Sequence, residues 1–205
     1  MGDGNQYDHL FKVLLAGDAG VGKSAHFFTT VLSQFVRNGF DAESRSTIGV
    51  EFATRIVTVD DTRIKAQVWD TAGRPQYRAI TAAFYRGALG ALLLYDVTNS
   101  LSFRNIKAWV KELREYASPH IVAMLVGNKT DLGALRVVPA EVAAEFAMEN
   151  GMMYTETSAL DMSNVESAFE SVLSVIYSME LSNYTEPSSN SSKPMRMADR
   201  HLFDI

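Results

Sequence analysis

The sequence contains no cysteine among its 205 residues. Disulfides, thiolate metal sites and thiol redox motifs are therefore excluded. Its four histidines are scattered, without the spacing of a metal site. Lys and Arg number 19 against 24 Asp and Glu, so no basic excess favours nucleic acid as a partner. No apolar run is long enough to span a membrane, and the start does not resemble a signal peptide. We expect a soluble intracellular monomer.

What the chain does have is alternation of apolar, strand-like runs with helical patterns. This pattern favours an α/β fold with a mostly parallel sheet and helices on both faces. The Asp60-Asp61 pair predicts a hairpin, so one of six strands should run antiparallel. The expected strands are 9–16, 50–59, 62–69, 90–96, 121–126 and 152–156, and the expected helices are 23–37, 76–86, 101–116, 139–149 and 163–180. We predict a flexible start over 1–8, one domain over 9–180, and a disordered tail over 181–205, which is rich in Ser, Asn and Pro.

A glycine-rich motif, GDAGVGKS, runs from Gly17 to Ser24 between an expected strand and an expected helix. Glycines let the backbone curl around an anion, and the start of the following helix adds a positive dipole end. Lys23 is predicted to reach the terminal phosphates of a nucleotide, and the Ser24 hydroxyl to bind Mg²⁺. The alternative is a turn without a ligand. By itself the motif indicates a nucleotide but does not choose the base.

The choice of base comes from Asn128, Lys129 and Asp131, after the apolar run that ends at Val126. A carboxylate in the base pocket accepts two hydrogen bonds from guanine, whereas adenine has no matching donors and would leave that carboxylate unpaired. The segment Ser158, Ala159 and Leu160 would complete the pocket with a backbone N–H for the guanine oxygen. The predicted ligand is GTP. A P-loop kinase or ATPase would fit the first motif, but this second motif speaks against adenine.

Over roughly residues 8–180 the sequence resembles the Rab family of small GTPases. The resemblance rests on five motifs in register, which are Gly17 to Ser24, Ser46 to Phe52 (STIGVEF), Trp69 to Gly73 (WDTAG), Asn128 to Asp131 (NKTD) and Glu156 to Leu160 (ETSAL). The segments 77–81 and 85–88 are similar to the recycling-endosome branch, the A group of plants. The resemblance implies the P-loop small-GTPase fold and a regulated GTP/GDP switch with GTPase activity in vesicle-mediated and protein transport.

The resemblance also implies roles for individual residues. Thr47 would contact Mg²⁺ and the γ-phosphate, Asp70 would hold Mg²⁺ through a water, and the N–H of Gly73 would sense the γ-phosphate. Phe40 would pack on the guanine face; Thr47 as an exposed loop residue and Phe40 as a core aromatic are the alternatives. The implied nucleotide contacts are Ala19, Gly20, Val21, Gly22, Lys23, Ser24, Ala25, Phe40, Thr47, Gly73, Asn128, Lys129, Asp131, Ser158, Ala159 and Leu160, with Ser24, Thr47 and Asp70 at the metal.

The partners implied are an exchange factor, a GTPase-activating protein and effectors. They would bind through an exposed apolar set formed by Ile48, Phe52, Trp69 and Tyr77. Trp69 could equally be a strand residue packed under a loop.

The implied catalytic set, Lys23, Gly73 and position 74, contains a departure from the family pattern. Arg74 stands where the family has a water-positioning glutamine. A guanidinium has only donors and cannot accept a hydrogen bond from the attacking water. We therefore expect slow hydrolysis. The competing idea is that Arg74 stabilises charge in the transition state, but Pro75 restricts it to extended conformations.

A second departure is an excess of about five residues after Ser24, before the family pattern resumes at Val31. Five extra helical residues would lengthen the helix by about 7.5 Å and rotate the downstream residues by roughly 140°. A longer helix, a bulge or a displaced first switch loop could absorb them. The alternative function is a non-hydrolysing interaction module that depends on guanine nucleotide, in which this excess has altered the pocket.

A third departure concerns membrane attachment. The tail over 181–205 offers no cysteine for prenylation, and the start, Met1 to Gln6, does not match the myristoylation pattern. We expect a cytoplasmic protein that is transiently present at endosomal or Golgi membranes.

Overall fold

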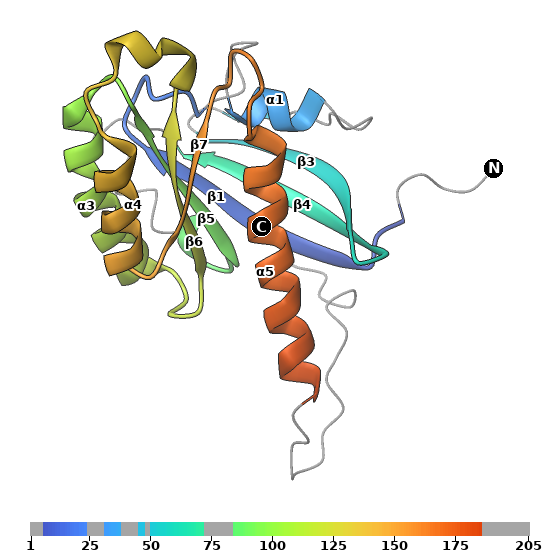
Figure 1. The fold of residues 1–205 in the computed structure, drawn as a ribbon. Helices are drawn as coiled ribbons and strands as arrows, with labels where there is room; N and C mark the ends of the chain where they lie inside the picture. Colours follow the sequence, from blue (N-terminus) through green and yellow to red (C-terminus); the bar gives the residue numbers. More distant parts are fainter. Residues whose placement is uncertain (1–5, 24–30, 38–44, 48–49, 72–83, 186–205) are drawn as a thin grey trace.

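The computed structural model describes residues 6–23, 31–37, 45–47, 50–71 and 84–185. Within them a central sheet is covered by helices on both faces (Figure 1). The sheet has seven strands in the order β2-β3-β4-β1-β5-β6-β7. The strands are β1 (His9–Gly17), β2 (Arg45–Thr47), β3 (Val50–Val59), β4 (Thr62–Thr71), β5 (Gly90–Asp96), β6 (Val122–Asn128) and β7 (Met153–Thr157).

The six expected strands and the α/β architecture are confirmed. β3 pairs antiparallel with both β2 and β4, while the other neighbours pair in parallel, so β3 is the one strand of opposite direction. The hairpin between β3 and β4 turns at Asp60 and Asp61, whose φ angles of 47° and 61° match a two-residue hairpin turn. The seventh strand, β2, was not predicted, because its three residues carry no apolar alternation.

Two hydrophobic layers flank the sheet, and the alternation of side chains along β1 separates them. Phe11, Val13 and Leu15 face the layer of α1 (Val31–Arg37) and α5 (Val165–Thr185), whereas Leu14 and Ala16 face the layer of α3 (Ser100–Tyr116) and α4 (Ala140–Glu149). A central parallel strand buried on both faces reads as a continuous apolar run, as Val13 to Ala16 of β1 do. Among the described residues, no helix combines the length and apolar character needed to cross a bilayer.

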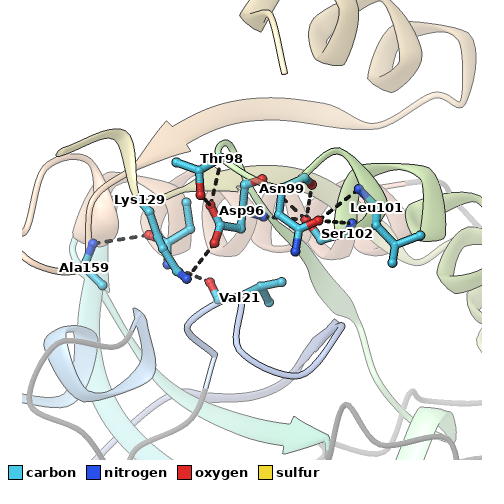
Figure 2. Close-up of polar contacts among 9 residues, drawn as sticks. Val21, Asp96, Thr98, Asn99, Leu101, Ser102, Lys129 and Ala159 are labelled. Carbon is cyan, nitrogen blue, oxygen red and sulfur yellow. Dashed lines mark hydrogen bonds and ion pairs between the residues drawn. The ribbon is translucent and has the colours of Figure 1, made fainter. Parts of the chain in front are cut away.

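The predicted helices after β5 are confirmed, with small shifts of their ends. α3 begins at Ser100, where the Asn99 side chain accepts hydrogen bonds from the N–H groups of Leu101 and Ser102 (Figure 2). α4 begins after Pro139 and is followed by Gly151 at a positive φ of 63°. Of the expected helix 76–86, Phe84 and Tyr85 are helical, and 76–83 lies outside the described residues.

The last helix corrects one predicted boundary. α5 continues to Thr185, so residues 181–185 of the expected disordered tail are helical. Serine content suggested the tail, but Ser178 and Ser182 lie within the helix and donate their hydroxyl hydrogens to carbonyls four residues earlier. Residues 1–5 and 186–205 lie outside the described part, so the predictions for the two ends stay predictions there.

The first helix corrects another prediction, that of one helix over 23–37. The N–H of Val31 donates to the carbonyl of Gly22 at 2.9 Å, and the N–H of Leu32 donates to Lys23 at 3.2 Å. Each bond spans nine residues instead of the four of an α-helix, which is an excess of five. In an unbroken helix residues 22 and 31 would lie about 13.5 Å apart along the axis, so these bonds exclude it. Residues 24–30 themselves lie outside the described residues.

α1 is nevertheless packed in the core. Val31, Leu32 and Phe35 are buried, and the Phe35 ring stacks on Phe169 of α5 with centroids 3.9 Å apart. Arg55 of β3 donates to the carbonyl of Phe35 at 2.9 Å and pairs with Glu166 of α5. The helix is therefore held against the sheet and α5 in spite of the five-residue excess before it.

Candidate functional site

The polar residues predicted from sequence gather at one edge of the sheet. β4, β1, β5, β6 and β7 run parallel, so their carboxyl ends meet there, which is where open α/β sheets bind ligands. The strand ends bring together Gly17 from β1, Asp70 from β4, Asp96 from β5, Asn128 from β6 and Thr157 from β7.

The loop after β1 depends on two glycines with close neighbours. Gly17 has φ +140°, and a Cβ there would lie 2.3 Å from the carbonyl oxygen of Leu94 on β5. Gly22 has φ +95°, and a Cβ there would lie 2.4 Å from Nδ2 of Asn128. Both positions therefore require glycine for backbone conformation and for space. Glycine at these two positions thus lets the loop pack closely against β5 and against Asn128.

Lys23 lies inside this loop, with only 4% of its surface exposed. Its Nζ donates to the carbonyl of Gly17 at 2.7 Å and to that of Asp18 at 2.6 Å. Burial lowers the pKa of the ammonium, while the charges of Asp70 and Asp18 oppose that change. An ammonium has three N–H donors, so these two carbonyls leave a third for a phosphate oxygen. The geometry suits the predicted role of Lys23.

Asp70 is buried at the carboxyl end of β4, where it pairs in register with Leu15 of β1 and Glu51 of β3. Its charge acts on Lys23, so a carboxylate and an ammonium are placed together beside the loop. The predicted Mg²⁺ site needs one carboxylate and the hydroxyls of Ser24 and Thr47. Of these three the structure describes the side chain of Asp70 alone, and its carboxylate is an oxygen ligand of the kind that Mg²⁺ prefers. In the described part, no cluster of three His, Asp or Glu offers a competing metal site.

Asn128 links the phosphate loop to the base loop. The side chain, 1% exposed, donates from Nδ2 to the carbonyl of Val21 at 2.9 Å. Its Oδ1 accepts from the Thr157 hydroxyl at 3.1 Å and from the N–H of Ala159 at 3.2 Å. Figure 2 shows the bonds to Val21 and Ala159. In this structure the amide of Ala159, one of the three residues predicted to offer a backbone N–H to the guanine oxygen, is thus bonded to Asn128.

Ser158 orients the carboxylate predicted to bind guanine. Its fully buried hydroxyl donates to Oδ1 of Asp131 at 2.6 Å and accepts from the N–H groups of Leu160 and Asp161 at 3.2 and 3.3 Å. Asp131 itself is exposed, at the start of the 3₁₀ helix η2 (Thr130–Leu135). A carboxylate anchored from one side and open on the other can accept the two guanine donors.

Lys129 is held by a residue that sequence reasoning missed. Its backbone is left-handed, with φ 70°, and its Nζ lies 2.6 Å from Oδ2 of Asp96 (Figure 2). Oδ1 of Asp96 accepts from the N–H and hydroxyl of Thr98 at 2.8 and 2.7 Å. Burial alone would raise the pKa of Asp96, but the bonds from Lys129 and Thr98 outweigh it and lower the pKa. Its position at the carboxyl end of an apolar strand, shared with Asp70 and Asn128, was the available signal.

A second ion pair joins the two segments that are predicted to bind the base. Arg136, directly after η2, donates to both carboxylate oxygens of Glu156 on β7, at 2.7 and 2.8 Å. The Tyr154 hydroxyl donates to the same carboxylate at 2.8 Å. Burial raises the pKa of Glu156, but the bonds from Arg136 and Tyr154 more than compensate and lower it. A bidentate pair fixes orientation as well as distance, so it aligns the segment after Asp131 with the strand before Ser158.

The predicted partner-binding surface is partly described. Phe52 of β3 and Trp69 of β4 stack with centroids 5.3 Å apart, and Phe84 lies 5.7 Å from Trp69. Lys12 places its Nζ 4.7 Å from the Trp69 ring and donates to the carbonyl of Arg86 at 2.9 Å. Trp69 is half-buried, so it is a packed strand residue that still presents part of its ring.

Most of the remaining predicted residues have no described side chain. Thr47 is described only by its backbone, which pairs with Val50 in β2 and β3. Ser24, Ala25, Phe40, Ile48, Gly73, Arg74 and Tyr77 lie outside the described residues. Ala19 and Gly20 are exposed at the tip of the phosphate loop, and Val21 is buried.

A comparison with protein-family models agrees with this site. The model described as the Ras family matches residues 12–178, which is most of the 205-residue chain and includes the phosphate loop, Asp70 and both base-binding segments. Domains of that family bind guanine nucleotide with Mg²⁺, hydrolyse GTP and interact with exchange factors, GTPase-activating proteins and effectors. The chain belongs to the Ras family of GTP-binding switch proteins.

Proposed function

We propose that this protein is a Rab-like GTP switch in vesicle trafficking with slow intrinsic hydrolysis. The observation that carries its nucleotide-binding part is the side chain of Asn128. It bonds Val21 of the phosphate loop and Ala159 of the base loop, and Gly22 has no room for a Cβ beside it. The two halves of a nucleotide site are thereby held at a fixed spacing. The motifs STIGVEF, WDTAG and ETSAL support the Rab assignment, and segments 77–81 and 85–88 support the recycling-endosome branch.

The switch part rests on where the described strands end. β2 ends at Thr47, β3 begins at Val50, and β4 ends at Thr71, two residues before Gly73 and three before Arg74. Contacts of the γ-phosphate with Thr47 and Gly73 would order both segments, and hydrolysis would release them. The stacked Phe52 and Trp69 lie on the strands that join these segments. A partner bound to this aromatic pair would therefore sense the nucleotide state.

Slow hydrolysis rests on Arg74. Hydrolysis breaks the bond between the β,γ-bridging oxygen and the γ-phosphorus as water attacks, and an amide that accepts from that water orients it. Arg74 offers donors only. Single-turnover hydrolysis of bound GTP should rise at least tenfold in Arg74→Gln. An unchanged or lower rate would overturn the proposal in favour of charge stabilisation by Arg74.

Purification of the protein without added nucleotide gives a direct readout of its resting state. Co-purified GTP supports an intact pocket with impaired hydrolysis, and GDP indicates turnover at an ordinary rate. Competition of ATP against GTP tests base selectivity, which the anchored carboxylate of Asp131 predicts to favour GTP strongly.

A second candidate is a guanine-nucleotide-dependent interaction module that does not hydrolyse GTP. The nine-residue hydrogen-bond spans into α1 favour it, because they mark a departure beside the phosphate loop. The two candidates differ in rates. A switch exchanges GDP faster with an exchange factor and hydrolyses GTP faster with a GTPase-activating protein, whereas the module keeps one nucleotide state.

One experiment in cells tests both the trafficking role and the proposed location, which is the cytoplasm with transient presence at endosomal or Golgi membranes. Ser24→Asn removes the hydroxyl predicted to bind Mg²⁺ and should favour the GDP state. The trafficking proposal expects tagged wild-type protein, but not this variant, on vesicles that carry recycling cargo. An identical diffuse distribution of both would contradict it.

A further inference from the structure

The second residue of the phosphate loop, Asp18, points its side chain at α3. Its Oδ2 accepts from Nδ2 of Asn105 at 2.7 Å, and its Oδ1 accepts from Nε1 of Trp109 at 3.0 Å. Trp109 is 1% exposed and belongs to the core between α3 and the sheet. The carboxylate is therefore bound at both oxygens to one rigid helix.

The backbone of the same residue holds the phosphate-binding lysine. The carbonyl of Asp18 accepts from Nζ of Lys23 at 2.6 Å, shorter than the 2.7 Å bond to Gly17. Two hydrogen bonds thus join α3 to the Asp18 side chain, and a third joins the Asp18 carbonyl to the ammonium that meets the nucleotide. Gly17 is itself fixed by its close approach to Leu94 of β5. Asp18 lies between Gly17, which approaches β5, and the exposed residues Ala19 and Gly20. α3 therefore holds the phosphate loop at the residue between its contact with β5 and its exposed tip.

The charge of Asp18 also favours phosphate binding by Lys23. Burial lowers the pKa of the Lys23 ammonium, whereas the charges of Asp70 and Asp18 raise it and so favour the protonated amine. A protonated amine is the form that binds phosphate. Asn105 and Trp109 are neutral donors, so they orient the carboxylate without cancelling its charge.

We propose that Asp18 is a positioning residue for phosphate binding, which ties the loop to α3 through Asn105 and Trp109 and thereby fixes the ammonium of Lys23. The inference rests on guanine nucleotide binding by this chain. It predicts an effect that depends on the number of phosphates, because Lys23 is placed for the phosphates beyond the first, whereas the base is held by Asn128 and Asp131. A carboxylate that only stabilised the fold would affect all guanine nucleotides alike.

The experiment measures the affinities of the purified full chain for GDP and GMP, with Mg²⁺, by competition against a fluorescent GDP analogue. Asp18→Ala should reduce the preference for GDP over GMP at least tenfold. Trp109→Phe, which removes one donor and keeps an aromatic ring, should reduce it about threefold. Lys111→Ala, at an exposed position on the same helix, is the matched control and should leave the preference unchanged.

A double variant that exchanges the carboxylate and the amide tests the link to α3 separately from the negative charge at position 18. The double variant Asp18→Asn with Asn105→Asp keeps one amide and one carboxylate facing each other, and an acceptor remains for Trp109. We expect a preference for GDP within threefold of wild type, and a lower one in Asp18→Ala. If the double variant has wild-type thermal stability but does not recover the preference for GDP over GMP, the role of the link is overturned.

The inference is also overturned if Asp18→Ala and Trp109→Phe lower the affinities for GDP and GMP by equal factors, or leave both unchanged. Because Trp109→Phe retains the buried ring, it keeps the test valid if Asp18→Ala does not fold. A wild-type protein that binds neither GDP nor GTP would instead overturn the proposed function. The two failures are therefore distinguishable.

Discussion

The N–H of Val31 donates to the carbonyl of Gly22, nine residues earlier in the chain. The next pair, Leu32 and Lys23, repeats the relationship one residue later. These are the bonds that an α-helix would form with residues 26 and 27, displaced by five. The backbone hydrogen bonds to Gly22 and Lys23 are therefore donated by residues five positions further along the sequence than in an unbroken α-helix.

Deletion of five residues, 25–29, should preserve nucleotide binding. The shortened chain would bring Val31 and Leu32 to helical spacing from Gly22 and Lys23, with the buried contacts of α1 unchanged. We expect a dissociation constant for GDP within threefold of wild type and an equal or higher melting temperature. Deletion of three residues, 27–29, is the control, because it rotates α1 out of register by two residues, roughly 200°. Equal behaviour of the two deletions would contradict the register.

Gly22→Ala should weaken GDP binding at least tenfold. A Cβ there would lie 2.4 Å from Nδ2 of Asn128 and would require φ +95°, so the substitution combines a clash with backbone strain of about 1–2 kcal/mol. Gly20→Ala is the matched control, since φ is +83° but no atom lies within 4 Å of the added Cβ. Dissociation rates of a fluorescent GDP analogue distinguish the two. A control as damaging as Gly22→Ala would show that strain, rather than contact with Asn128, limits the site.

Asn128→Ala should accelerate GDP release strongly. The truncation leaves the carbonyl of Val21, the hydroxyl of Thr157 and the N–H of Ala159 without their partner, at about 1–3 kcal/mol for each buried group. We expect a release rate at least a hundredfold faster. Thr157→Val removes one of these bonds and should accelerate release by less than tenfold. Stopped-flow release into excess GTP measures both, and the reverse order of effects would exclude Asn128 as the link between the loops.

Acid should remove the stabilising contribution of Glu156. The pKa of Glu156 in the folded protein is below its ordinary value of 4.5, so its contribution is complete above that pH and is lost as the pH falls through the folded pKa. The difference in melting temperature between wild type and Glu156→Gln should be constant between pH 6 and 8. It should narrow below about pH 4.5. A difference that stays constant into acid would mean that the bond with Arg136 does not depend on the carboxylate charge.

The strands and the motifs were predictable because each depends on local chemistry. β1 and β5 each contain a buried apolar run, the hairpin turns at two aspartates, and α4 lies between a proline and a glycine. The P-loop and NKTD motifs use residue types at spacings that an anion and a guanine base require. Asp96 and Asp18 were missed because their partners, Lys129 for one and Asn105 and Trp109 for the other, lie 33 and up to 91 residues away.

The order of residues was sufficient to identify the ligand chemistry and the fold class, because periodicity and motif spacing express the backbone geometry they need. It left three ways to accommodate the excess after Ser24. The hydrogen bonds that span nine residues exclude one of the three, the longer helix. The core that receives Phe35 against Phe169, and the carbonyls of Gly22 and Lys23 that accept from Val31 and Leu32, place α1 in one register. Contacts between distant parts of the chain, a collective property of the folded protein, therefore decided the register of α1.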